Sequence, residues 1–161
     1  MLLVALFTFV AFGNASLRGG DVNVTGEAVV RVAMKYLGRP YRRGMAGPNG
    51  FDCSGFTSFI FKQFDISLNR DSRAQYGQGV SVGREELRIG DLVFFTSPRS
   101  GRTVGHVGIV SKVEDDGNFY FVHAASRGVI EDSYRTSPYY YNRYVGARRV
   151  ISEADSLAVG M

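Results

Sequence analysis

The first stretch of regular hydrophobic spacing begins at Gly26. Its apolar residues recur at the intervals of one helix face: Ala28, Val29, Val32, Ala33, Tyr36 and Leu37. Thr25 offers a side-chain oxygen that can cap the first turn, while Gly38 and Pro40 end the pattern. We therefore predict an amphipathic helix that begins at Gly26 and stops near Gly38.

A second helical pattern follows the Gly- and Pro-rich stretch at residues 44–50. Four apolar residues share one helix face: Phe56, Phe59, Ile60 and Phe64. This spacing predicts a helix that reaches about Phe64, with Cys53 at or just before its N-terminus. Residues 65–90 alternate polar and small residues and contain several glycines, so we expect a long irregular connection with one helical turn near residues 72–77.

The second half of the chain has the pattern of short strands. Five apolar runs predict them, at residues 92–95, 107–113, 119–122, 129–131 and 145–151. Residues 114–118, Glu-Asp-Asp-Gly-Asn, form a strong turn sequence, so the second and third strands are expected to pair as an antiparallel hairpin. Helices followed by an antiparallel sheet indicate an α+β fold.

The start of the chain bears on location. Residues 1–12 are almost wholly apolar, and small residues occupy the positions that precede a cut after Ala15. This resembles a secretory signal peptide and is short for a membrane span. No Lys or Arg precedes the run, so either the true start lies upstream or the signal is atypical; a buried first helix is the alternative.

The resulting organisation has four parts. We expect a signal peptide at residues 1–15, a linker at 16–25, one folded domain at 26–151 and a frayed tail at 152–161. No stable membrane span is expected in the mature chain. A mass of 17.7 kDa with 45% apolar residues fits one domain with a single sizeable core.

Charge and cysteine content exclude some classes of protein. The net charge is +4, but the Lys and Arg residues are scattered and form no recognisable nucleic-acid motif. No nucleic-acid partner is therefore expected. The charge suits an anionic polymer or surface, and a merely solvated basic face is the alternative. A single cysteine excludes an intrachain disulfide.

That single cysteine, Cys53, is the best candidate for a nucleophile. At a helix N-terminus, unpaired backbone N–H groups and the positive end of the helix dipole favour the thiolate, which is the reactive form. The same N–H groups could stabilise an oxyanion. A free cysteine buried in the core is the alternative, because cysteine is among the most buried residue types.

Two histidines provide the remaining chemistry. His106 opens the strand at residues 107–113, and His123 closes the strand at residues 119–122. In an antiparallel hairpin the start of one strand lies opposite the end of the next, so the two rings should be neighbours at one end of the sheet. A thiol, a base and a group that orients the base are the parts of a cysteine hydrolase. Two unrelated hydrogen-bonded histidines at strand ends are the alternative.

A zinc site is a second chemical alternative. Its ligands would be Cys53, His106, His123 and a carboxylate such as Asp52. The close ligand pairing typical of such sites, of the Cys-x-x-Cys or His-x-x-x-His kind, is missing. We therefore expect no metal and no cofactor.

Six ordered motifs resemble the NlpC/P60 family of cell-wall endopeptidases. They lie at residues 41–44, 51–56, 88–95, 105–109, 121–126 and 144–150. The resemblance runs from about Val29 to Ile151. It implies a papain-like core in which the helix that carries the nucleophile packs on an antiparallel sheet that carries the histidines.

The resemblance also implies roles for single residues. Cys53 corresponds to the nucleophile, His106 to the base, and His123 to the residue that orients this base. Tyr41 corresponds to a tyrosine whose hydroxyl points toward the oxyanion; a half-buried aromatic in a turn is the alternative. The residues that flank the nucleophile are expected to line the cleft: Asp52 and Ser54.

This chain departs from the family pattern at three places. Met45 replaces a glycine, residues 68–72 replace a common Leu-Pro-Arg-Ser/Thr run, and residues 96–104 form a Ser-, Gly- and Arg-rich loop before His106 that is expected to close over the cleft. All three border the expected substrate groove. They therefore bear on the peptide preference rather than on the chemistry.

The function implied by the resemblance is hydrolysis of peptide bonds in bacterial peptidoglycan by an exported enzyme in the periplasm, cell envelope or medium. The single-domain layout resembles the subgroup that cleaves cross-links between diaminopimelate and D-alanine, whereas other members cut the D-glutamyl–diamino-acid bond. Two alternatives stay open: a papain-like amidase or acyltransferase on another substrate, and a wall-binding module with an inactive site. The sequence identifies no regulatory partner.

Overall fold

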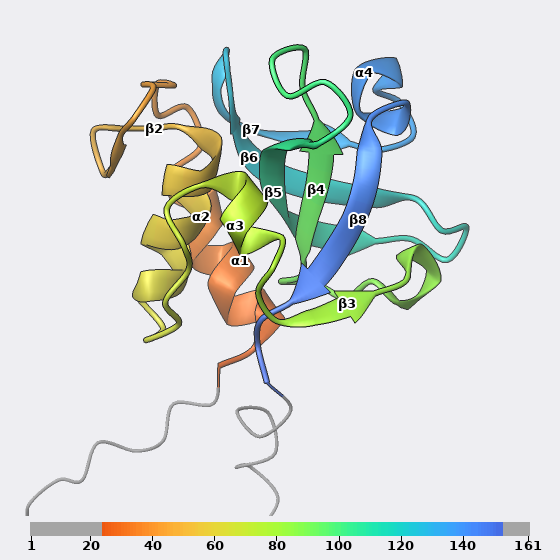
Figure 1. Ribbon diagram of the computed structural model, residues 1–161. Coiled ribbons are helices and arrows are strands. Elements are labelled where there is room, and N and C mark those ends of the chain that lie inside the picture. The colour runs from red at the N-terminus through yellow and green to blue at the C-terminus, as the bar shows by residue number, and fades with distance from the viewer. Residues whose placement is uncertain (1–23, 153–161) are drawn as a thin grey trace, which may run out of the picture.

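A six-stranded antiparallel sheet lies at the centre of the structure, a computed structural model that describes residues 24–152 (Figure 1). Its strands lie in the order β3-β8-β4-β5-β6-β7. Their bounds are Val80–Val82 for β3, Leu92–Thr96 for β4, Val104–Val113 for β5, Phe119–Ala125 for β6, Gly128–Ser133 for β7 and Tyr144–Arg149 for β8. The α+β class predicted from the sequence is confirmed.

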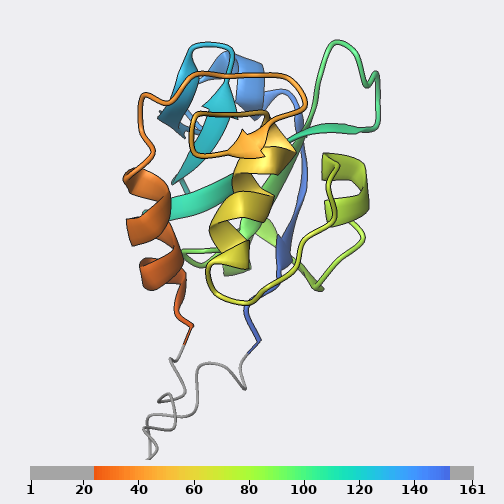
Figure 2. The same ribbon diagram turned by 90° about the vertical axis from the view of Figure 1, so that its left-hand side faces the viewer.

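Two helices pack side by side against one face of this sheet, α1 at Gly26–Met34 and α2 at Cys53–Lys62 (Figure 2). Thr25 caps α1 as predicted, since its hydroxyl oxygen accepts a hydrogen bond from the Ala28 N–H at 3.1 Å. A short hairpin of β1, Ala46–Gly47, and β2, Gly50–Phe51, leads directly into α2. No helix among residues 24–152 has the length and apolar character needed to cross a membrane.

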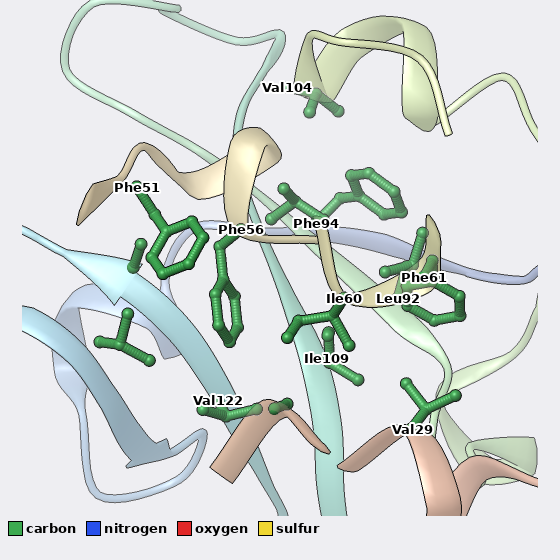
Figure 3. Packing of buried hydrophobic residues seen from close by; sticks show 14 residues of the cluster. Val29, Phe51, Phe56, Ile60, Phe61, Leu92, Phe94, Val104, Ile109 and Val122 are labelled. Atoms are coloured by element: carbon green, nitrogen blue, oxygen red, sulfur yellow. The ribbon is translucent and has the colours of Figure 1, made fainter. Parts of the chain in front are cut away.

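The sheet is buried on both faces. In β4, Leu92 and Phe94 join the core beneath α1 and α2, whereas Val93 and Phe95 join a second cluster on the opposite face. Figure 3 shows the first core, in which Phe56 and Ile60 of α2 point toward the sheet. An unbroken apolar run such as residues 92–95 is the pattern of a strand covered on both sides.

The predicted strands and the β5–β6 hairpin are confirmed, but several boundaries differ. β5 begins at Val104 and β6 continues to Ala125, so His106 and His123 lie inside their strands rather than at their ends. The two predicted helices also end earlier, at Met34 and Lys62.

Five short elements lie in stretches for which no regular structure was predicted. These are the β1–β2 hairpin, β3, the 3-10 helix η1 at Arg84–Glu86 and α4 at Pro138–Tyr141. The helical turn predicted near residues 72–77 is present as α3, Ser72–Gln75. β3 exists because it pairs with β8, which is remote in sequence, and a pattern read within one short window does not contain that partner.

Parts of the predicted organisation fall outside the described residues. They are the signal peptide at 1–15, the linker at 16–25 except for Val24 and Thr25, and the tail at 152–161 except for Ser152.

Candidate active site

The start of α2 is held by one carboxylate. Asp52 is the N-cap residue, and its Oδ1 accepts a hydrogen bond from the Gly55 N–H at 2.7 Å. Its Oδ2 accepts another from the Gly44 N–H at 2.9 Å, which ties the preceding loop to the helix. The sequence needs glycine at position 55, because a Cβ there would lie 2.2 Å from the Met45 carbonyl oxygen. These contacts fix Cys53 as the first residue of the helix.

An arginine that sequence reasoning did not single out completes this arrangement. Arg70 donates through Nη1 to Asp52 Oδ1 at 2.9 Å and through Nη2 to Asp52 Oδ2 at 2.6 Å. Its Nη1 also donates to the Ser54 hydroxyl at 3.2 Å. A two-point contact of this kind is the strongest geometry for an Arg–carboxylate pair.

Asp52 and Ser54 therefore stabilise the helix start. Neither belongs to the described residues that line the neighbouring cleft, and the Ser54 residue is only 6% exposed. The expectation that these two side chains line the cleft is not met. The reason is local. The Asp52 carboxylate turns back toward the helix N–H groups that it caps, and the Ser54 side chain, two residues later, is directed into the protein.

A cleft of about 860 Å³ opens at this end of the sheet. Cys53 lines it from the start of α2, His106 from β5 and Tyr41 from the loop before β1. The cleft is also lined by residues 97–100 of the β4–β5 loop and by Tyr139 and Tyr140 of α4. Figure 1 shows this loop, in green, and α4 at the same end of the sheet as the start of α2.

The Cys53 thiol lies within hydrogen-bond reach of the Val107 backbone in β5, and Cys53 and His106 line the same cleft. Backbone hydrogen bonds at Ser54 and Val107 act on the sulfur and favour its thiolate. Burial outweighs them, however, and together with the Asp52 carboxylate it raises the pKa of the Cys53 thiol above the ordinary value. The expectation that the helix N-terminus makes the thiolate the favoured form is therefore wrong for the free protein.

The two histidines are neighbours, as the hairpin predicted. His106 Nε2 and His123 Nδ1 are 2.8 Å apart, and His123 Nε2 is 3.0 Å from Asp132 Oδ2 of β7. Ile109 pairs with Val122, which sets Gly108 opposite His123. A Cβ on Gly108 would lie 2.7 Å from the Phe121 ring and 3.1 Å from the His123 Cβ. Glycine at this position thus leaves the space that His123 and Phe121 occupy.

This chain of contacts fixes the tautomers of both rings. The hydrogen bond from His123 lowers the pKa of the Asp132 carboxyl, so Asp132 is ionised and can only accept a hydrogen bond. His123 Nε2 therefore carries the hydrogen and its Nδ1 is the acceptor. His106 must then donate from Nε2, which leaves its Nδ1 as the unprotonated nitrogen. His106 Nδ1 is therefore the ring nitrogen that can accept a proton.

Burial keeps both rings neutral. It lowers the pKa of His106 well below the ordinary value, and the positive charge that His123 can carry lowers it further. Burial also lowers the pKa of His123, against the opposing effect of Asp132. In the free protein at neutral pH the site therefore holds a neutral thiol and a neutral imidazole.

Tyr140 packs against both histidine rings. Its ring stacks on His106 with centroids 5.6 Å apart and meets the edge of His123 at 5.0 Å. The rings of Phe95 and Phe121 pack on the Tyr140 ring, with centroids 5.0 and 5.1 Å from its own. Tyr140 thus restricts the orientation of His106 and excludes water from the pair.

Tyr41 lines the same cleft as Cys53 and His106. A parallel bridge joins Tyr41 to Phe51, two residues before Cys53. Burial raises the pKa of the Tyr41 hydroxyl, and the negative charges of Cys53 and Asp52 raise it further. This hydroxyl therefore stays protonated and can donate a hydrogen bond into the cleft.

Sequence reasoning missed three residues of this site: Arg70, Asp132 and Tyr140. The run Glu131-Asp132 after a short strand was the one available signal, since a carboxylate beside a histidine strand can orient the ring. Within residues 24–152 no three His, Cys, Asp or Glu side chains are placed to hold a metal ion. The histidine nitrogens contact each other and Asp132 instead.

Comparisons with known proteins identify the fold and the family. The model of the NlpC/P60 family matches residues 38–149. A solved NlpC/P60 family protein from Bacillus cereus superposes with a TM-score of 0.72 at 35% identity, over 81% of this chain and 41% of that one. The expected combination of helices and an antiparallel sheet is present in this chain, and its fold is that of this NlpC/P60 neighbour.

Two curated relatives bear informative names. The Escherichia coli K12 protein "Murein DD-endopeptidase MepS/Murein LD-carboxypeptidase" is 42% identical over 120 residues, which are 74% of this chain and 60% of that protein. The "Gamma-D-glutamyl-L-lysine dipeptidyl-peptidase" of Bacillus cereus is 37% identical over 125 residues, which are 78% of this chain and 36% of that protein. This chain thus spans less than two thirds of either relative. Because the family model matches 38–149 without a break, the chain belongs to the NlpC/P60 family.

Proposed function

We propose that this protein is a cysteine endopeptidase that hydrolyses peptide bonds of bacterial peptidoglycan through Cys53, His106 and His123. One observation carries the mechanism: a thiol and a histidine share a cleft, and that histidine leads through His123 to a carboxylate, Asp132. The names of the relatives support the substrate, since one is a murein endopeptidase and the other a peptidase of a γ-D-glutamyl-L-lysine bond.

The reaction begins with proton transfer. His106 Nδ1 takes the Cys53 proton as the sulfur attacks the carbonyl carbon of the scissile amide, because the resting pair is neutral. His106 becomes an imidazolium that is stabilised through His123 by the charge of Asp132. His123 thus keeps the base in its tautomer and spreads the charge without itself taking the thiol proton.

The tetrahedral intermediate needs donors for its oxyanion. Tyr41 lines the cleft and α2 begins there at Cys53, so the Tyr41 hydroxyl and the backbone N–H groups of the first helical turn are the proposed donors. The imidazolium then gives its proton to the leaving amine, and a thioester remains on Cys53. Water, deprotonated by His106, hydrolyses that thioester and restores the free thiol.

The bond that is cut belongs to one of two kinds. The family resemblance implies either a cross-link between diaminopimelate and D-alanine or the bond that follows a γ-linked D-glutamyl residue, and the relatives named murein DD-endopeptidase and γ-D-glutamyl-L-lysine dipeptidyl-peptidase support these two kinds. Of the alternatives considered from the sequence, an amidase or acyltransferase would use the same thiol. Only the identity of the acyl donor and acceptor distinguishes these reactions.

Digestion of purified sacculi tests the proposal. The wild-type protein should release peptide fragments whose masses identify the bond, while Cys53→Ser and His106→Ala should each lose at least roughly a thousandfold in rate. Lys112→Ala, on the exposed far end of β5, is the control and should remain active. Each variant should keep the wild-type melting curve. Full activity in a folded Cys53→Ser protein would remove Cys53 as the nucleophile.

Loss of Asp132 should weaken the base without abolishing it. Asp132→Asn should reduce kcat/KM by roughly a hundredfold, because the tautomer of His123 is no longer fixed. The acidic limb of the pH profile should move to lower pH, since removing a negative charge disfavours the imidazolium. Glu131→Gln on the same strand is the matched control. An unchanged acidic limb in Asp132→Asn would refute the proposed effect of Asp132 on His106 through His123. His123→Ala should reduce kcat/KM less than His106→Ala does.

Alkylation of Cys53 reports the resting state of the pair. With the thiol pKa raised and the His106 pKa lowered, the thiolate fraction is small at neutral pH. The rate with iodoacetamide should therefore rise steadily between about pH 6 and pH 9. A plateau below neutral pH would instead indicate a thiolate–imidazolium pair in the free enzyme.

The substrate also implies a location. Peptidoglycan lies outside the cytoplasmic membrane, so we propose that the protein is exported to the periplasm, the envelope or the medium. N-terminal sequencing of the native protein should then give a chain that begins at or near Ser16. A protein that retains Met1 in the cytosol would contradict export.

A further inference from the structure

Three arginines line the cleft: Arg73, Arg99 and Arg127. Two carboxylates line it as well, and both are engaged. Asp71 caps α3 by accepting from the Ala74 N–H at 2.9 Å, and Asp132 contacts His123 at 3.0 Å. The two carboxylates therefore leave part of the positive charge of the cleft wall uncompensated.

Two of these arginines have partners within the protein. Arg73 Nη2 donates to the Thr103 hydroxyl at 3.0 Å, and Arg127 Nη2 lies 3.6 Å from Asp132 Oδ1. Arg99 differs, because within residues 24–152 it forms no ion pair and no side-chain hydrogen bond. It is also exposed. Arg99 is thus the cleft arginine whose guanidinium is open to a ligand.

The loop that carries Arg99 is braced. The Ser97 N–H donates to the Ser100 hydroxyl at 2.7 Å, and the Ser100 hydroxyl donates to the Thr103 carbonyl at 2.7 Å. The contact from Arg73 joins the same turn to α3. Arg99 is therefore presented from an ordered turn, which reduces the entropy lost when a ligand binds.

Arg99 shares the cleft with Cys53, His106 and Tyr41. Its positive charge lowers the pKa of the Tyr41 hydroxyl, against the larger raising effect of burial. A substrate that fills this cleft of about 860 Å³ can therefore contact the Arg99 guanidinium while its scissile amide lies at Cys53. The planar fork of a guanidinium matches a carboxylate through two parallel hydrogen bonds.

We propose that Arg99 binds a free carboxylate next to the scissile amide and so selects substrates that carry it. The inference rests on the proposed function and adds the specificity of the site. Both bonds considered above have such a group: the carboxylate on the D-carbon of diaminopimelate, and the α-carboxylate of a γ-linked D-glutamyl residue. A substrate with a primary amide in place of that carboxylate should be a poor one.

The test compares two synthetic peptides that contain the bond identified with sacculi and differ only in this carboxylate or its amide. Wild-type enzyme should favour the carboxylate in kcat/KM by about tenfold, the size of one charge-assisted hydrogen bond. Arg99→Gln should bring the ratio close to one, with Arg99→Lys in between. Arg102→Gln is the matched control, because Arg102 belongs to the same loop and does not line the cleft; it should keep the wild-type ratio.

A second readout is independent of turnover. Affinity of the two peptides for Cys53→Ala protein, measured by calorimetry, should show the same preference and lose it when Arg99→Gln is added. Equal efficiency on both peptides, or a preference that survives Arg99→Gln, would overturn this inference and leave the peptidase intact. A wild-type protein that cleaves neither peptide nor sacculi would overturn the proposed function and this inference together.

Discussion

The Asp52 carboxylate is the interaction on which the site depends. It joins three segments, because it caps α2 through Gly55, holds the preceding loop through Gly44 and binds Arg70 of the following connection. The position of Cys53 is a consequence of these contacts. The same carboxylate disfavours the Cys53 thiolate through its charge, and Arg70 offsets part of that charge. Structural support and reactivity are therefore coupled at this residue.

Burial of the sheet on both faces has a chemical consequence. His123 is fully buried on the face that carries Phe95 and Phe121, so its ring can be retained only with its polar atoms paired. His106 and Asp132 pair them, and this pairing determines the tautomer of the base. In the proposed mechanism the aromatic cluster around Tyr140 thus contributes through desolvation and orientation of the histidines, in addition to stability.

The site combines a neutral resting pair with a positively charged wall. In the proposed reaction the proton moves from the thiol to the imidazole only when substrate is in place. The free-energy cost of forming the imidazolium is therefore part of the reaction barrier. A carboxylate bound at Arg99 would bring its own negative charge near that developing cation. Substrate binding and activation of the base would then favour one another by ordinary electrostatics.

The sequence alone determined the elements with strong local patterns and the residues they carry. The helix that begins at Cys53, the apolar strands and the turn at 114–118 placed the thiol at a helix start and the two histidines side by side, because periodicity and turn chemistry act over a few residues. Only the tertiary structure decided that Asp52 and Ser54 turn away from the cleft, that burial opposes the helix dipole at Cys53, and which remote residues complete the site. Arg70, Asp132 and Tyr140 reach it from separate segments, and contacts of that kind follow from how the elements pack, which no local pattern encodes.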